Sequence, residues 1–165
     1  AFFLFSFQVH EKSILIAAMP AILTFPLEPF MTFWLLQIST FSMLPLLVKD
    51  GLTGAFLGYS GAFLLLVKLA VDNLKSEKHQ DMNFLSILWN LNKSGKRGDK
   101  KLMENFMIFC YYLSTVVEVA LIIAFFYLKP PATLPFLHPL MISAFSCCHF
   151  LFFFLYFNVK QVFYE

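Results

Sequence analysis

The residues best suited to chemistry form one polar run near the start of the chain, between the apolar stretches 1–7 and 14–25. They combine an amide, an imidazole, a carboxylate, an ammonium group and a hydroxyl, in the order Gln8, His10, Glu11, Lys12 and Ser13. Ionisable residues beside a membrane helix are costly, so three in a row require a reason. The run precedes a predicted helix, whose free N–H groups and dipole favour an anion. These residues could therefore bind an anionic group. The alternative is a polar cap that reaches the lipid headgroups.

The composition places this run in an integral membrane protein. Of the 165 residues, 59% are hydrophobic, 13% are charged and 23 are phenylalanine. The mean hydropathy is +0.74, whereas about 25% of a soluble domain is charged. With a net charge of only +2, the chain predicts membrane lipid as a partner and no nucleic acid.

The chain starts at Ala1 without a methionine, and its first apolar run lacks the basic start and the cleavage site of a signal peptide. We therefore expect the C-terminal part of a longer protein.

The apolar runs predict about five membrane helices, because a bilayer core about 30 Å thick needs roughly 20 helical residues. The predicted helices span 13–25, 30–48, 52–71, 106–128 and 137–159. Pro20 is expected to kink the short first helix. Gly54 and Gly58 have the spacing that lets two membrane helices approach closely. The predicted fold class is all-α, a polytopic transmembrane helix bundle.

Three segments are predicted: 1–71, with the polar run and three membrane helices, a basic loop at 72–105, and 106–165 with two more helices. Residues 82–91 of the loop predict a short amphipathic helix on the membrane surface. Between 72 and 101 the loop carries seven lysines and arginines. Such residues are retained in the cytosol, so 72–101 is predicted to be cytosolic and 8–13 lumenal.

Inside the membrane helices, two further features need an interpretation. Glu118 lies near the middle of the fourth helix, where a charge is costly. We expect it to face the bundle, with Ser114 and Thr115 within reach and its role, structural or functional, left open. Cys147, Cys148 and His149 could suggest a metal site. Consecutive helical side chains point about 100° apart, however, and no fourth ligand is evident, so packing is the preferred interpretation. No metal, cofactor or disulfide framework is predicted.

The segment Phe5-Ser6-Phe7-Gln8-Val9-His10-Glu11-Lys12-Ser13-Ile14-Leu15 resembles the VHEK signature of the dolichyl-phosphate-glucose-dependent α-1,3-glucosyltransferases of the endoplasmic reticulum. Further similar stretches lie at 40–47, 130–135 and 146–158. The family has two branches, and the residues 6–8 resemble the enzyme that adds the first glucose. Its second-glucose paralogue tends to carry Gly-Trp-His there.

The resemblance implies a multi-pass enzyme of the endoplasmic reticulum membrane with a GT-C fold, of which this chain is the C-terminal portion. Its donor would be dolichyl-phosphate-glucose and its acceptor the terminal mannose of a dolichol-linked oligosaccharide, with inversion at the anomeric carbon. The catalytic base of the family lies upstream, so no catalytic residue is expected here and the chain alone should be inactive.

The resemblance also suggests roles for four residues, because negative charge grows on the phosphate as glucose departs. Lys12 would supply a fixed positive charge and His10 a hydrogen bond or partial charge. Glu11 would orient one of them or hold the neighbouring loop, and Gln8 would bind a sugar hydroxyl.

Three alternatives remain: the second-glucose paralogue, a fragment of a non-enzymatic transporter or channel, and, with less support, a scaffold module. A transporter should carry mid-membrane polar residues on several helices. In this sequence Glu118 looks nearly alone there.

Overall fold

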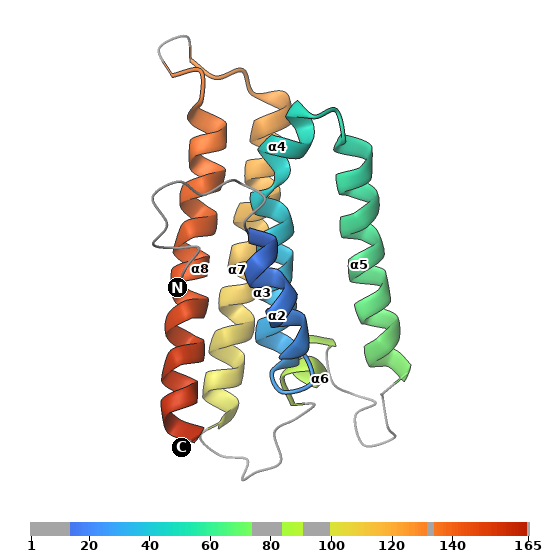
Figure 1. The fold of residues 1–165 in the computed structure, drawn as a ribbon, viewed down its shortest axis with the longest axis vertical. Helices are drawn as coiled ribbons and strands as arrows, with labels where there is room; N and C mark the ends of the chain where they lie inside the picture. Colours follow the sequence, from blue (N-terminus) through green and yellow to red (C-terminus); the bar gives the residue numbers. More distant parts are fainter. Residues whose placement is uncertain (1–13, 74–83, 91–99, 132–133, 165) are drawn as a thin grey trace.

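The computed structural model describes residues 14–73, 84–90, 100–131 and 134–164, and all regular structure among them is α-helical (Figure 1). The helices are α2 (Ile14–Leu23), α3 (Pro29–Ser42), α4 (Leu44–Lys49), α5 (Thr53–Asn73), α6 (Phe84–Asn90), α7 (Lys100–Tyr127) and α8 (Leu137–Tyr164). The predicted all-α bundle is therefore confirmed. The division into segments 1–71, 72–105 and 106–165 stays a prediction.

Not every predicted membrane helix has the length to cross a bilayer in the described part of the chain. Three stretches are long and apolar enough by length and composition: Pro29–Lys49, Leu102–Tyr127 and Leu137–Val162. In α5, which has 21 residues in all, the apolar stretch among the described side chains is Thr53–Leu69. The 10 residues of α2 span about 15 Å, which is half of the bilayer core.

Helix α3 lies at the centre of the bundle. It packs against α8 and also contacts α2, α4, α5 and α6, while α7 packs against α8 and α6. Figure 1 shows α3, α7 and α8 running side by side, with α2 against α3. The end of α5, α6 and the end of α8 lie at the lower end of this view, and α4 lies at the upper end.

The second predicted helix is divided into α3 and α4. The break falls at Met43, which ends α3 and precedes α4, with a proline in the first turn of α4. Pro45 has no N–H to donate, and its ring would clash with the carbonyl of Phe41 in a continuous helix. The expectation of one continuous helix over 30–48 is corrected accordingly. Pro20, by contrast, lies inside α2 without ending it.

The turn after α4 covers 50–51, between the second and third predicted helices. The N–H of Gly51 donates to the carbonyl of Val48 at 3.1 Å, and the N–H of Leu52 donates to that of Leu47 at 2.7 Å. Gly51 has a φ of 74°, in the left-handed region that favours glycine. The chain then reverses into α5.

The amphipathic segment predicted at 82–91 forms α6, but its apolar side faces the protein. Leu85, Ile87 and Leu88 are 4%, 4% and 0% exposed, and α6 contacts α3, α5 and α7. A helix on the membrane surface would instead insert its apolar face into lipid. The helix is confirmed and its expected setting is corrected: it covers one end of the bundle.

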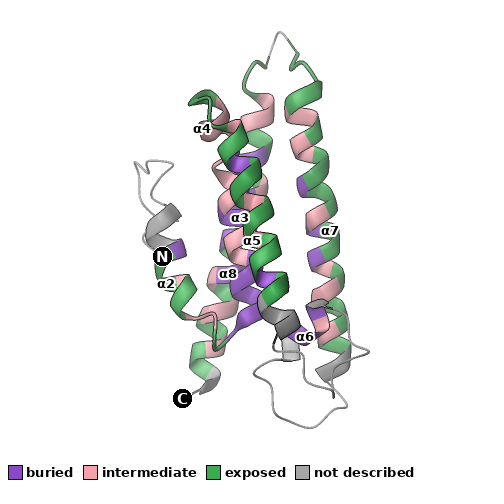
Figure 2. Ribbon diagram, turned by 90° about the vertical axis from the view of Figure 1, so that its right-hand side faces the viewer, coloured by how far each residue is buried: buried purple, intermediate pink, exposed green. Residues whose placement is uncertain are grey.

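The core is rich in aromatic rings and centres on Trp34. The ring centroids of Tyr111, His149 and Phe153 lie 5.8, 5.7 and 5.4 Å from that of Trp34. Figure 2 shows the buried positions along α3 and on parts of α7 and α8. Edge-to-face rings at such distances stabilise packing beyond the area they bury. Three helices that are far apart in sequence therefore meet around one tryptophan.

Candidate functional site

The predicted anion-binding residues Gln8, His10, Glu11 and Lys12 lie outside the described residues. Helix α2 begins at Ile14, two positions after Lys12 in the chain. Their place at a helix start and on the lumenal side therefore stays a prediction. What the structure describes is the helix that follows them and the contacts that hold this helix in place.

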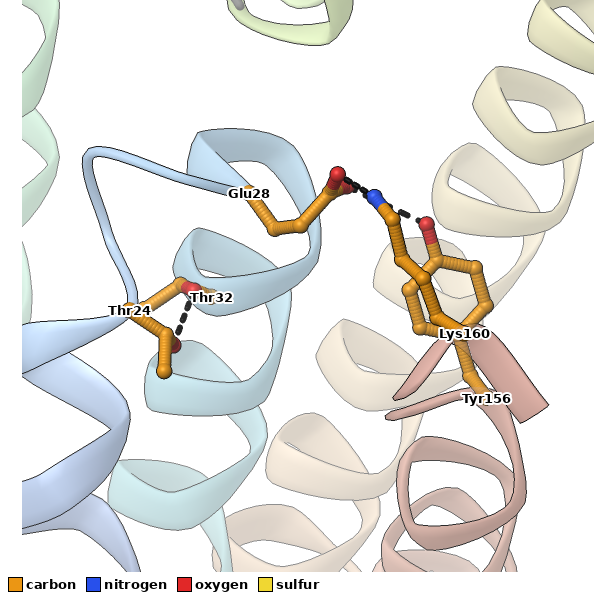
Figure 3. A network of polar contacts seen from close by, with 5 residues as sticks. All are labelled: Thr24, Glu28, Thr32, Tyr156 and Lys160. Carbon is orange, nitrogen blue, oxygen red and sulfur yellow. Dashed lines mark hydrogen bonds and ion pairs between the residues drawn. The ribbon is translucent and has the colours of Figure 1, made fainter. Parts of the chain in front are cut away.

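The first polar group of interest joins the α2–α3 turn to α8, and we call it the turn cluster (Figure 3). Its members are Thr24, Glu28, Thr32, Tyr156 and Lys160. The Glu28 carboxylate forms an ion pair with the Lys160 ammonium group and accepts a hydrogen bond from the Tyr156 hydroxyl at 3.1 Å. The two threonine hydroxyl oxygens lie 3.1 Å apart. Opposite charges thus meet where the turn approaches α8.

Local sequence helps to explain how the Glu28 side chain comes to contact α8. Glu28 is the N-cap residue of α3, and Pro29 follows in the first turn, where its missing N–H is not needed. The Glu28 side chain makes no capping hydrogen bond to the first N–H groups of α3. Its carboxylate still lies at the positive end of the helix dipole, which favours a negative charge.

The second polar group lies between α3, α7 and α8, and we call it the interior cluster: Trp34, Gln37, Tyr111, Ser114, Glu118 and His149. Glu118 is 8% exposed, which confirms that it faces the bundle. Its carboxylate accepts a hydrogen bond from the Gln37 amide at 2.8 Å. The Tyr111 hydroxyl donates to the Gln37 carbonyl oxygen, also at 2.8 Å. One amide therefore bridges two groups of α7.

Ser114 and Thr115, which we expected within reach of Glu118, form the described bonds with other groups. Thr115 donates to the backbone carbonyl of Tyr111 at 2.9 Å, a bond within α7. The Ser114 hydroxyl instead lies 2.9 Å from Nε2 of His149 and 3.3 Å from Nε1 of Trp34. Glu118 and Ser114 therefore bond to side chains of neighbouring helices.

The hydrogen bonds of His149 have a definite direction in the neutral imidazole. Nδ1 lies 2.9 Å from the carbonyl oxygen of Phe145, which can only accept, so Nδ1 carries the proton. Nε2 then accepts from the Ser114 hydroxyl, and Ser114 accepts from the indole N–H of Trp34. The bonds form a chain from α3 through α7 to α8.

The expectation that Glu118 is nearly alone at mid-membrane is corrected. Three helices contribute polar side chains to the interior cluster. Cys147 and Cys148 are exposed, while His149 turns inward. In the described part of the chain, no group of three or more His, Cys, Asp or Glu residues could hold a metal ion. The polar atoms described here bond to one another, an arrangement that holds helices together.

Sequence analysis missed both clusters as units. In the sequence, Glu28 lies between the first two predicted helices and Lys160 directly follows the last one, and nothing in their spacing pairs them. One feature of the sequence could have paired Glu28 with Lys160: both lie at helix ends predicted to be on the same side of the membrane. No comparable signal pointed to Gln37 or Ser114.

Comparison with known proteins gives a consistent result. The model of the ALG6, ALG8 glycosyltransferase family matches residues 1–156. The chain is 39% identical over 159 residues to a Gallus gallus protein named dolichyl pyrophosphate Man9GlcNAc2 alpha-1,3-glucosyltransferase, covering 96% of this chain and 31% of that protein. A Mus musculus protein of the same name is 38% identical over 162 residues, with the same coverage. A Drosophila melanogaster protein named probable dolichyl pyrophosphate Man9GlcNAc2 alpha-1,3-glucosyltransferase is 32% identical over 161 residues. The match covers 98% of this chain and 29% of that protein.

The chain thus spans about a third of the length of these relatives. No solved structure matches it significantly.

Proposed function

Because this chain belongs to the ALG6, ALG8 glycosyltransferase family, we propose that it is part of a membrane enzyme that adds glucose to a dolichol-linked oligosaccharide. One observation carries the proposal: relatives 38–39% identical over 96% of the chain are named alpha-1,3-glucosyltransferases. Their names also give the acceptor as dolichyl pyrophosphate Man9GlcNAc2. The location that fits this role is the membrane of the endoplasmic reticulum.

The proposed reaction is the first glucosylation. The acceptor in the relatives' names carries nine mannoses and no glucose, and the residues before the VHEK run, Ser6 to Gln8, resemble the first-glucose branch. The proposed donor is dolichyl-phosphate-glucose. An enzyme of the second-glucose branch would require an acceptor that already carries one glucose.

We assign donor binding to Gln8, His10, Glu11 and Lys12. They lie within the residues that the family model matches, directly before the chain enters α2. As the bond from glucose to phosphate breaks, negative charge grows on the phosphate, and Lys12 and His10 would stabilise it. Glu11 would orient one of these groups, and Gln8 would bind a sugar hydroxyl. No metal or cofactor takes part in this scheme.

The catalytic base is assigned to the rest of the protein. The polar side chains of the interior cluster bond to one another between helices, and the turn cluster holds an ion pair. Neither arrangement leaves a carboxylate poised to deprotonate a sugar hydroxyl. The 165 residues alone are therefore expected to be inactive.

The deciding experiment uses the full-length protein in proteoliposomes with dolichyl-phosphate-glucose as donor. Two acceptors are compared, dolichyl pyrophosphate Man9GlcNAc2 and the same lipid carrying one glucose. We expect α-linked glucose on the first acceptor, with kcat/KM at least about tenfold higher than on the second, a difference of about 1.4 kcal/mol. The reverse preference would assign the protein to the second-glucose branch. Transfer to neither acceptor would refute the proposal.

A transporter is not proposed, although the interior cluster spans three helices. Its buried groups are matched by partners inside the protein, and the family match covers nearly the whole chain.

A further inference from the structure

We propose that one side of the contact between α3 and α7 is a docking surface for a further membrane helix of the full-length protein. That helix would present an amide or hydroxyl side chain to the carboxylate of Glu118. The inference relies on the family to which the chain belongs, and not on the sugar that the enzyme transfers.

The Glu118 carboxylate is bonded through one oxygen only in the part of the chain that the structure describes. Its Oε2 accepts the hydrogen bond from the Gln37 amide at 2.8 Å, and its Oε1 accepts none. Oε1 is also not fully buried, and the residue as a whole is 8% exposed. The second oxygen therefore lies at the surface of the described bundle.

The depth of Glu118 makes an unbonded oxygen unfavourable. Glu118 lies nine residues before Tyr127, where α7 ends, or about 14 Å along the helix. Half of the bilayer core is about 15 Å thick, so a membrane-spanning α7 holds this carboxylate far from both water layers. Lipid tails form no hydrogen bonds, and polar groups at this depth have to be satisfied by protein. We therefore expect a protein group opposite Oε1.

Four polar side chains, two on each helix, form the surface that we call the polar seam: Gln37, Thr40, Thr115 and Glu118. Glu118 is buried and the other three are half-buried. The Thr40 hydroxyl donates to the carbonyl of Leu36 at 3.0 Å, and the Thr115 hydroxyl donates to that of Tyr111 at 2.9 Å. Each hydroxyl oxygen can still accept a hydrogen bond. The seam thus offers several acceptors to a neighbouring helix.

The polar seam opens on the side of α3 and α7 that faces away from α8. Trp34 and Ser114 mark the side towards α8, because they bond in a chain that ends at His149. Successive helical positions are turned by about 100°, so Thr40 lies about 120° round from Trp34 and Thr115 about 100° round from Ser114. Among the described helices, the main neighbours of α7 are α8 and α6, and α6 lies at the lower end of Figure 1.

The proposed occupant follows from the length of the relatives and from the chemistry of the seam. The chain covers 31% of the length of its Gallus gallus and Mus musculus relatives, so a full-length protein has ample further chain to supply a helix. A second charge at this depth is disfavoured. An amide or a hydroxyl can donate to an ionised carboxylate and can accept from a protonated one. Such side chains form hydrogen bonds between membrane helices, as the Gln37 amide does here.

The test is photocrosslinking in the full-length protein, with p-benzoylphenylalanine in place of Thr115. The matched control places the same amino acid at Leu113, which is 55% exposed and points about 160° away from Thr115. From position 115 we expect a crosslink within one polypeptide, to a peptide outside residues 1–165 that carries an amide or hydroxyl side chain. From position 113 we expect adducts with lipid, or none.

Three results would overturn the docking surface. A crosslinked dimer would place a second copy on the seam, and adducts with lipid alone would leave the seam facing the membrane. Equal crosslinking of both positions to the same peptide would show that the polar side is not selective. None of these measurements requires glucose transfer, so the proposed function and the docking surface can fail separately.

Substitutions of Glu118 in the full-length protein test the chemistry of the partner. Glu118→Gln should change the thermal midpoint by less than about 2 °C, because its amide can bond both to Gln37 and to an amide or hydroxyl. Glu118→Leu should lower the midpoint by about 2–4 °C. Replacing the crosslinked polar residue by alanine as well should lower it no further, since both changes remove the same bond. A large fall in Glu118→Gln would indicate a basic partner, and additive losses would indicate no contact. Either result would refute the assigned partner.

Discussion

Glu28 and Glu118 are both 8% exposed, yet the chain accommodates the two carboxylates in different ways. Glu28 lies at a helix start, within reach of the ammonium group of Lys160 near the end of α8. Glu118 lies inside α7 and receives the Gln37 amide instead. A second charge at mid-membrane would cost about 2.5–3.5 kcal/mol, whereas near a helix end a lysine can reach the interface. Position along the helix therefore selects the partner.

Ser114 is the residue that joins three helices, and its removal should be measurable. Ser114→Ala leaves Trp34 and His149 without the hydroxyl between them. We expect a loss of about 0.6–1.7 kcal/mol of unfolding free energy, from the average to the maximum measured for hydrogen bonds between membrane helices. Denaturation of the purified protein in detergent measures it.

The control for Ser114 is another buried serine. Ser39 is 5% exposed, but its hydroxyl bonds only to the carbonyl of Leu35 in its own helix among the bonds described. Ser39→Ala should cost little, because such back-bonding contributes nothing between helices. Equal losses in the two variants would contradict the role given to Ser114.

Lys12 and His10 are expected to stabilise the departing phosphate. Lys12→Ala and His10→Ala in the full-length protein should each lower kcat by about 10²- to 10³-fold, as for other positioned groups that meet developing charge. Glucose transfer at saturating donor measures the effect, and size-exclusion chromatography shows whether the variants fold. Normal transfer in both variants would reduce the polar run to a helix cap.

At the scale of elements, prolines and one glycine set the boundaries between helices. Pro29 starts α3, and Pro45 separates α3 from α4. Gly51 reverses the chain with its positive φ. The close helix approach predicted at Gly54 and Gly58 is not found in the described structure. A Cβ at either position would meet nothing within 4 Å. Among the described residues, no helix packs against the face of α5 that carries these glycines.

The two kinds of glycine should respond differently to alanine. Gly51→Ala should destabilise the protein by about 1–2 kcal/mol, because a Cβ is strained at a φ of 74°. Gly58→Ala should be neutral or should stabilise by up to about 1 kcal/mol, since alanine is the better helix former and open space surrounds it. Thermal unfolding of the full-length variants measures both effects. A marked loss in Gly58→Ala would show that another helix packs there.

At the scale of the whole molecule, the connections alternate between two ends of the bundle. The end of α5, α6 and the end of α8 share one end in Figure 1, with α4 at the other. Of the basic loop predicted at 72–101, the described helix α6 lies at the first end. Positive residues remain cytosolic, so we expect this whole end to face the cytosol.

Sidedness can be tested at Asn92, the single Asn-x-Ser/Thr site of the sequence. We expect Asn92 to remain unglycosylated in cells, because glycosylation requires lumenal exposure. In sealed microsomes, a membrane-impermeant maleimide should label Ser94→Cys directly and Ala132→Cys only after permeabilisation. A glycan on Asn92, or labelling in the opposite order, would invert the topology.

The sequence by itself determined the membrane class, the family and most helix positions. Apolar runs of about 20 residues, prolines and a glycine turn act locally, so their effects can be read from neighbouring residues. The VHEK run likewise needed no partner to be recognised. The residues of this run lie outside the described structure, so their role stays a prediction.

Only the tertiary structure decided which polar groups meet. Trp34, Ser114 and His149 are separated by 80 and 35 residues, and Glu28 and Tyr156 by 128. A helix that is apolar on all sides gives no sign of which face turns inward, because lipid and protein interior favour the same side chains. The rotation of each helix about its own axis follows from packing of the whole bundle. That rotation brings Gln37 to Glu118 and Lys160 to Glu28.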